Sequence, residues 1–182
     1  MLNDKILNEC IEIIKVYKIY DKCITDGKFD IDKFKYNVNW TSVSLSQELS
    51  EGFIREFKGN VNWFDVSCFQ KLSEEFIREF KDKVKWFDIS WNQTLSEEFI
   101  REFKDHVDWS NITRGQELSE EFIREFKDEV NWYYISMCQK LSEEFICDHL
   151  DKINIGYLIE NTKINLTKEF KDKIKVLKML IE

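Results

Sequence analysis

The hydrophobic residues of this chain recur in a fixed order with a period of 23 residues. Leu-Ser-Glu-Glu-Phe-Ile-Arg-Glu-Phe-Lys occupies 72–81, 95–104 and 118–127, a variant occupies 49–58, and a diverging copy begins at Leu141. Tryptophan keeps the same period, at Trp40, Trp63, Trp86, Trp109 and Trp132. Self-similarity at a fixed period of this length is the signature of a repeat architecture.

The first half of each repeat predicts a helix, here called helix A. In the copy that starts at Leu72, Ser73 is placed as an N-cap, and glutamates follow it in the first turn, where negative charge is favourable. Leu72 and Ile77 have the spacing of a hydrophobic staple. A single apolar stripe then follows at helical spacing, formed by Phe76, Ile77, Phe80 and Val84.

The second half predicts a shorter helix of about two turns, here called helix B. Its fixed members in the copy 131–139 are Trp132, Ile135, Ser136 and Gln139, and an Asn or Asp commonly precedes the Trp as a cap. The alternative is a strand, because the segment is rich in β-branched and aromatic residues and the period falls in the leucine-rich-repeat range. Strict alternation of apolar residues and the leucine-rich signature are both missing, which favours the helix.

Neither helix can bury its apolar face alone, so stacked copies must cover one another. We therefore predict an all-α fold, an α-solenoid of short antiparallel helix pairs with a capping helix at each end. One repeat domain is expected over 1–182, with an N-terminal cap in 1–25, tandem helix pairs in 26–162 and a C-terminal capping helix in 163–182. An N-terminal apolar stripe supports the first cap, through Ile6, Leu7, Cys10, Ile11, Ile14 and Tyr17.

Composition narrows the classes of partner. The formal net charge of −8 disfavours nucleic acid and anionic membranes, and no stretch approaches the roughly 20 apolar residues that a membrane span requires. The absence of proline and the presence of only 5 glycines disfavour turn-rich β architectures. The 5 cysteines are irregularly spaced and follow no apolar signal segment, which favours a reducing, cytoplasmic location.

The fixed polar and aromatic positions have structural and functional interpretations. The repeated Glu and Arg residues predict a solvated helix face with i,i+4 pairs such as Glu74 with Arg78, and less readily a charged binding stripe. The tryptophans predict core packing rather than a stacking platform for bases. The repeated glutamines predict a structural ladder rather than a readout column, because a reading code would vary from copy to copy: Gln47, Gln70, Gln93, Gln116 and Gln139.

The search for catalytic chemistry finds almost nothing. His106 lies at a position that changes between copies, and Cys147 with His149 lies in the diverging copy without the two-pair spacing of zinc sites. No orienting third group accompanies a cysteine–histidine pair, and no glycine-rich phosphate loop is present. We expect no enzyme activity, no metal and no cofactor.

We expect a partner to bind at positions that differ between copies of the repeat, since the remaining positions are the same in every copy. The differing positions follow the Trp of helix B and include two further positions near the end of that helix. Aromatic residues there have the composition of interface anchors, although packing between neighbouring repeats is an equal alternative. The candidate partner-binding residues are Phe64, Phe87, Trp91, Tyr133 and Tyr134.

The repeat Leu-Ser-Glu-Glu-Phe-Ile-Arg-Glu-Phe-Lys-Asp-x-Val-x-Trp-x-x-Ile-Ser resembles the tandem repeats of proteins encoded by giant DNA viruses of amoebae, such as relatives of mimivirus. The resemblance covers about residues 30–160, and the segment 147–150 departs from it. It implies a viral origin, a repeat architecture and a host-cell cytoplasmic location, and it implies no particular activity. The resulting hypothesis is a scaffold for a protein partner, with a host factor as the candidate partner. The alternative is a self-assembling structural protein, and the oligomeric state is open.

Overall fold

The computed structural model describes residues 2–181, without the side chains of 177, 178, 180 and 181. The chain forms two compact units, Met1–Ile89 and Ser90–Glu182. The prediction that 1–182 is a single domain is not decided by this division and stays a prediction.

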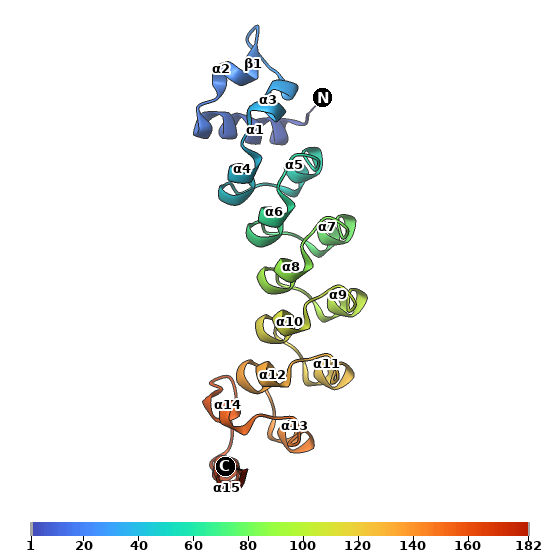
Figure 1. Cartoon of the computed structure of the whole chain (residues 1–182), viewed down its shortest axis with the longest axis vertical. Helices are drawn as coiled ribbons and strands as arrows, with labels where there is room; N and C mark the ends of the chain where they lie inside the picture. Colours follow the sequence, from blue (N-terminus) through green and yellow to red (C-terminus); the bar gives the residue numbers. More distant parts are fainter. Residues whose placement is uncertain (1, 182) are drawn as a thin grey trace. The chain divides into compact units, whose positions relative to one another are not determined.

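The first unit begins with a terminal segment and continues with helix pairs (Figure 1). Its elements are α1 (Asp4–Tyr17), α2 (Tyr20–Cys23), β1 (Ile24–Thr25), β2 (Lys28–Phe29), α3 (Ile31–Asn37), α4 (Trp40–Ser46), α5 (Glu51–Glu56), α6 (Trp63–Phe69) and α7 (Glu74–Glu79). Helix α8 (Trp86–Asn92) crosses the boundary between the units.

The second unit continues the same alternation and ends in a long helix (Figure 1). Its elements are α9 (Glu97–Glu102), α10 (Trp109–Gly115), α11 (Glu120–Glu125), α12 (Trp132–Cys138), α13 (Glu143–Asp148), α14 (Ile155–Glu160) and α15 (Lys168–Ile181). The A helices of this unit are α9, α11 and α13, and the B helices are α10, α12 and α14. Each B helix packs on the next B helix, α10 on α12 and α12 on α14, as α4 packs on α6 in the first unit. The predicted α-solenoid of repeated short helix pairs is confirmed.

Helix A begins as the sequence predicts but ends earlier. The Ser73 hydroxyl accepts a hydrogen bond from the Phe76 N–H at 3.2 Å, and Leu72 and Ile77 are both buried. Helix α7 then stops at Glu79, with Phe80 as its C-cap. Val84 reaches the core from a turn, in which its N–H donates to the Phe80 carbonyl at 3.1 Å, so the apolar stripe extends past the helix.

Helix B is a seven-residue helix, as predicted, and not a strand. In α6 the Asn62 side chain caps the first turn by accepting from the Phe64 N–H at 3.0 Å. Val66 and Ser67 are buried against the neighbouring helices. The buried Ser67 hydroxyl donates to the Trp63 carbonyl at 2.7 Å and accepts from the Lys85 N–H at 2.9 Å, so it joins its own helix to the following repeat.

The predicted glutamine ladder is present. The Gln116 side chain donates to the carbonyls of Ser90 and Gln93 at 3.3 and 2.7 Å and accepts from the Leu95 N–H at 3.1 Å. Each buried glutamine therefore satisfies three backbone groups of the preceding repeat that water cannot reach. The same set of bonds recurs at Gln70 in the first unit and at Gln139 in the second.

The repeated tryptophans are half-buried rather than fully buried core residues. The Trp109 indole N–H donates to the Lys104 carbonyl at 3.1 Å, and its ring lies 5.0 Å from that of Phe126. The predicted core role is therefore met by one face of the indole, while the other face reaches the surface. The carbonyl five residues earlier accepts the same bond at Trp40, Trp63, Trp86 and Trp132.

The N-terminal cap differs from a simple helix because it contains a small β-hairpin. Strands β1 and β2 pair antiparallel across Asp26 and Gly27, whose φ angles are 49° and 73°. An Asp-Gly pair with positive φ at both positions is the turn that matches the twist of a two-stranded hairpin. The buried face of α1 is also shifted from the predicted stripe. Of the predicted residues, Ile6, Cys10 and Ile14 are buried, whereas Leu7, Ile11 and Tyr17 are only half-buried. Ile13, which was not predicted, is buried.

The terminal segments reproduce hydrogen bonds that a further repeat would make. In helix α1 the Glu9 carboxylate accepts from the Ser50 N–H and hydroxyl at 3.1 and 2.6 Å. After α14, the Asn161 amide donates to the Ser136 and Gln139 carbonyls at 2.9 Å each, which is the bonding of a ladder glutamine. The described helices include none that is both long enough and apolar enough to cross a membrane.

Candidate partner-binding surface

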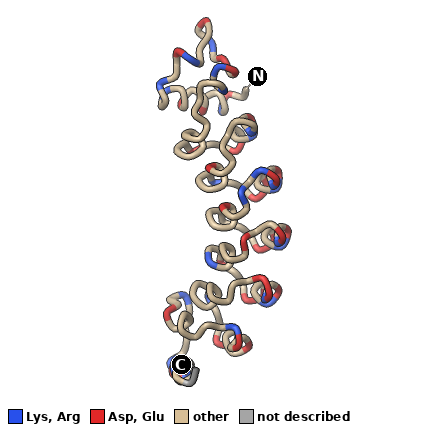
Figure 2. The backbone as a smooth tube through the Cα atoms, in the orientation of Figure 1, with Lys and Arg blue, Asp and Glu red and all other residues tan. Residues whose placement is uncertain are grey.

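The charged residues lie mainly on the A helices. Figure 2 shows Lys, Arg, Asp and Glu clustered on the A helices of each unit, whereas the B helices are mostly uncharged. The expected i,i+4 pairs are present, with Arg78 and Glu74 at 3.7 Å and Arg101 and Glu97 at 3.6 Å. The predicted solvated helix face is therefore confirmed only in part, because the same side chains also contact the next repeat.

The contacts from one A helix to the next are regular. Arg101 donates to Glu125 at 2.8 Å, and its guanidinium lies 4.9 Å from the centre of the Phe122 ring. The Glu97 carboxylate accepts from the Ser119 N–H at 2.6 Å, so it binds the N-cap residue of the following A helix. In the first unit Arg55 makes the same contacts with Glu79 and Phe76. The hydrogen bond and charge of Glu125 raise the pKa of the Arg101 guanidinium, which therefore stays charged.

The B helices carry their variable residues at positions that range from exposed, as at Phe64, to buried, as at Asp65. We call the second, third and sixth residues of each B helix, counted from the Trp, the B face. The sixth residue lies four residues after the second and three after the third, which are the spacings of neighbours on a helix surface. In α6 they are Phe64, Asp65 and Cys68; in α10, Ser110, Asn111 and Arg114; and in α12, Tyr133, Tyr134 and Met137.

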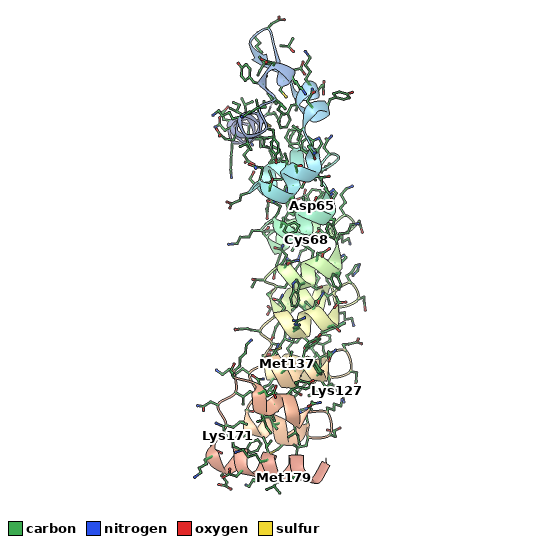
Figure 3. The ribbon with its side chains drawn as sticks, turned by 60° about the vertical axis from the view of Figure 1, so that its left-hand side comes forward. Asp65, Cys68, Lys127, Met137, Lys171 and Met179 are labelled. Atoms are coloured by element: carbon green, nitrogen blue, oxygen red, sulfur yellow. The ribbon has the colours of Figure 1, made fainter. Side chains whose placement is uncertain are left out.

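The five predicted binding residues all lie on the B face. Four are exposed: Phe64 by 52%, Phe87 by 63%, Trp91 by 42% and Tyr133 by 41%. Tyr134 is half-buried. Phe64 and Phe87 belong to the first unit, and Trp91, Tyr133 and Tyr134 to the second. Figure 3 shows Asp65 and Cys68 on the same helix, and Met137 marks the B face of the second unit.

In the second unit an arginine that the sequence analysis did not select connects two of the predicted residues. The Arg114 guanidinium lies 4.7 Å from the centre of the Trp91 ring and 5.6 Å from that of Tyr134. Such cation–π contacts hold the aromatic rings in place while leaving their edges at the surface. The sixth residue of one B helix therefore contacts the third residue of the next B helix.

In the first unit the same two positions are in contact through a hydrogen bond: Cys68 is the sixth residue of α6, and Asp88 is the third residue of α8. Burial is the main cause that raises the pKa of the Cys68 thiol to about 12, and a hydrogen bond to Asp88 adds to it. Asp65 is buried one turn earlier, and its Oδ2 atom has no hydrogen-bond partner among the described residues. An unpaired buried carboxylate oxygen costs stability, so the B face of this unit is not optimised for folding alone.

Three tyrosines form the C-terminal part of the B face. The Tyr133 ring centre lies 5.1 Å from that of Tyr134 and 4.4 Å from that of Tyr157 in α14, with interplanar angles of 87° and 62°. A hydrogen bond with Tyr157 raises the pKa of Tyr133, so the Tyr133 hydroxyl stays protonated at neutral pH. Tyr157 was not among the predicted residues, although the 23-residue period places it in the register of Tyr134.

The cysteine–histidine pair near the C-terminus has a structural role on the histidine side. The His149 ring stacks on Phe145 at 4.3 Å and on Trp132 at 5.2 Å, and its Nδ1 atom lies 2.9 Å from the Phe145 carbonyl oxygen. His149 thus takes the place of the phenylalanine found there in other repeats. Within the part of the chain that the structure describes, no three His, Cys, Asp or Glu residues are grouped to hold a metal ion.

The chain defines a protein built from tandem 23-residue helix pairs. No family model, no curated protein and no solved structure matches it.

Proposed function

We propose that the chain is a non-catalytic scaffold that binds a protein partner through the B face. The observation that supports this most is the contrast between the two layers of each unit. The repeated charges of the A helices contact neighbouring repeats, whereas most of the varying aromatic residues of the B helices are exposed. Exposed aromatic residues beside an arginine are the composition of binding hot spots.

The support for a protein partner, rather than a nucleic acid, comes from charge. The chain carries 35 acidic and 27 basic residues, and Arg114 is the basic residue of the B face in α10 and α12. A phosphate backbone needs several basic contacts along its length. Tyrosine, tryptophan and arginine side chains suit a folded protein surface better.

The proposed partner is a host protein, and the proposed location is the host cytoplasm. Both rest on the resemblance of the repeat to those of giant DNA viruses of amoebae. The test is affinity capture from an amoebal lysate with the intact chain and two variants. One variant combines Phe64→Ala and Phe87→Ala in the first unit, and the other combines Trp91→Ala and Tyr133→Ala in the second.

The matched control changes exposed residues of the A helices, Glu98→Ala and Glu121→Ala. Circular dichroism verifies that all variants keep their helices. A protein recovered by the intact chain and the control, but lost with either aromatic pair, supports the proposal and identifies the unit that binds. Equal recovery by all four proteins contradicts it.

Self-assembly is the second candidate, because helix α15 exposes apolar side chains at the end of the second unit. Val176 is 57% and Met179 is 77% exposed. Light scattering over a range of concentrations tests this candidate, with Val176→Asp and Met179→Asp as the variant. Growth of the intact chain that the variant abolishes supports assembly through α15, and a strict monomer contradicts it.

A further inference from the structure

The protein holds a lysine ammonium over one of its repeated tryptophans. Lys152 Nζ lies 5.3 Å from the centre of the Trp132 ring and 3.7 Å from Asp128 Oδ1. The ammonium is thus held between an aromatic face and a carboxylate, the combination that recognises organic cations. Asp128 and Lys152 lie in the turns that precede α12 and α14, and Trp132 is the first residue of α12.

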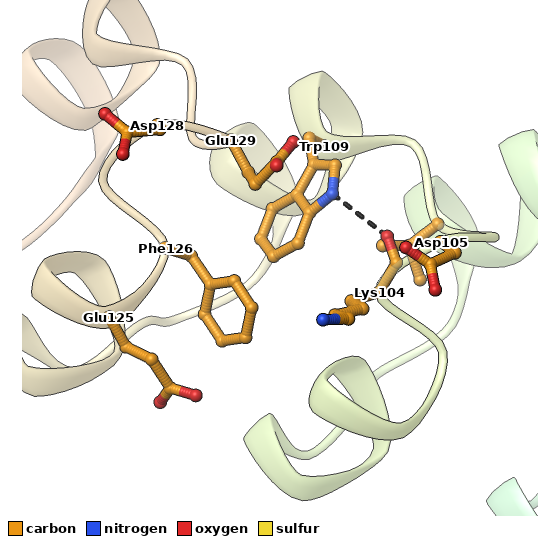
Figure 4. Close-up of a pocket in the computed structure, with 8 residues that line it drawn as sticks. Lys104, Asp105, Trp109, Glu125, Phe126, Asp128 and Glu129 are labelled. Atoms are coloured by element: carbon orange, nitrogen blue, oxygen red, sulfur yellow. Dashed lines mark hydrogen bonds between the residues drawn. The ribbon is translucent and has the colours of Figure 1, made fainter.

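One repeat earlier, the equivalent tryptophan and aspartate are present but the lysine is not. Subtracting 23 residues places Trp109 at the position of Trp132 and Asp105 at the position of Asp128, but Glu129 replaces Lys152. A pocket of about 500 Å³ opens there. Figure 4 shows Trp109 and Phe126 inside it, with Glu129 beside the indole.

The aromatic floor of this pocket is rigid. The Trp109 indole is fixed by its 3.1 Å hydrogen bond to the Lys104 carbonyl, and the Phe126 ring lies 5.0 Å away. Val107, which is buried, completes the apolar part of the lining. The protein's own packing and hydrogen bonding therefore hold the aromatic floor of the pocket.

The walls carry more negative charge than the protein itself neutralises. Glu125 pairs with Arg101 at 2.8 Å and Asp128 with Lys152 at 3.7 Å. Among the described residues, Asp105 and Glu129 pair with no cation, and Lys104 is the single basic residue of the lining. An added cation would thus meet two carboxylates and an indole face.

We propose that this pocket, here called the Trp109 pocket, binds a lysine side chain of a partner polypeptide. The partner's ammonium occupies the position that Lys152 occupies over Trp132, between the indole and the carboxylates of Asp105 and Glu129. The apolar stem of the lysine lies along Phe126 and Val107, as long cationic side chains do on apolar surfaces. The site is independent of the B face, since it lies on the turns between the two helices of a repeat.

Because Glu129 and Lys152 occupy equivalent positions in successive repeats, exchanging the residue type at each position tests the proposal in both directions. Glu129→Lys places the protein's own ammonium over Trp109 and closes the pocket, while Lys152→Glu removes the ammonium from Trp132 and opens a second pocket. Both changes introduce a residue that another repeat already carries at that position, so both variants are expected to fold. Glu144→Lys, an exposed change on α13, controls for the altered net charge.

The probe is tetralysine, and the readout is the NMR signal of each tryptophan indole N–H, assigned with Trp109→Phe and Trp132→Phe. In the intact chain we expect tetralysine to shift the Trp109 signal. Glu129→Lys should weaken this binding about tenfold or more, and Glu144→Lys by much less. Lys152→Glu should add a shift of the Trp132 signal.

Three results would overturn the proposal. The first is an unchanged response of Trp109 in Glu129→Lys. The second is an equal loss in Glu144→Lys, which would reduce the effect to general electrostatic attraction. The third is a Trp132 signal that stays unmoved in Lys152→Glu.

Discussion

The A and B helices of one repeat are constrained in different ways. In helix A the first glutamate and the arginine contact both their own helix and the following A helix, as Glu97 does with Arg101 and Ser119. In helix B the inward residues carry the corresponding contacts, through Thr113 and Gln116. The backbone hydrogen bonds that join successive B helices therefore do not depend on the variable residues of the B face. A repeat protein can separate assembly from recognition within a segment of 23 residues.

The largest expected effect on stability is the difference between truncating a phenylalanine that every A helix repeats and truncating one that varies between B helices. Phe122 is fully buried under Arg101, so Phe122→Ala should lower the free energy of unfolding by about 3–5 kcal/mol. Phe64→Ala on the B face should lower it by less than about 1 kcal/mol, because that ring is 52% exposed. Urea unfolding followed by circular dichroism measures both. Similar losses would show that the B face also contributes to the core.

The next effect concerns the glutamine ladder. Gln116→Leu leaves the Leu95 N–H and the Ser90 and Gln93 carbonyls without partners in a buried site. At about 1 kcal/mol for each unpaired group, the free energy of unfolding should fall by about 3 kcal/mol. Gln47→Leu is the control, because Gln47 is only half-buried at the start of the ladder. The prediction fails if the two variants unfold at the same urea concentration.

A smaller effect is expected at the N-caps of the A helices. Ser119→Ala removes the acceptor of the Phe122 N–H and should cost about 1 kcal/mol. Ser119→Thr should preserve stability, since Thr167 already caps α15 through a hydroxyl that accepts from the Phe170 N–H at 3.2 Å. Thermal unfolding of the two variants tests the pair. A threonine variant as unstable as the alanine variant would exclude capping as the cause.

The smallest effect probes the contact from the sixth residue of one B helix to the third of the next. With a pKa of about 12, Cys68 is thiolate in roughly one molecule in 10,000 at pH 8, so alkylation by iodoacetamide should be very slow. Asp88→Asn should speed the reaction, because it removes the negative charge beside the thiol. Mass spectrometry of digests gives the rate, with the exposed Cys147 as internal reference. An unchanged rate would leave burial as the whole cause.

The repeat frame could be read from the sequence because each fixed residue has a role that its type and spacing reveal. Ser73 as a cap, Gln116 in a ladder and the two-turn helix B all follow from general rules. The early end of helix A was not foreseen, since Val84 keeps helical spacing although it lies in a turn. Periodicity reports which residues are buried and does not show where the backbone stops being helical.

The contacts between repeats were harder to predict. Arg101 and Glu97 are visible as an i,i+4 pair, but the position of Glu125 depends on how the next helix is placed. The positions of Arg114 between two aromatic rings and of Lys152 over Trp132 depend on the same placement. His106, Glu129 and Lys152 occupy the same position of successive repeats. The sequence shows that this position varies, but it does not show that the residue there faces a tryptophan.

Glu9 makes the same bonds to an N-cap serine as the glutamate of an A helix, and Asn161 makes two of the bonds of a ladder glutamine. This has a consequence for how the number of repeats can change. Because both terminal segments offer the same hydrogen bonds as a repeat, each internal repeat meets equivalent partners before and after it. In-frame duplication or loss of one repeat would leave the ladder and cap hydrogen bonds at every junction unchanged. The number of repeats can therefore lengthen or shorten in a single genetic event, and the set of outward residues can be reshuffled without redesigning the fold.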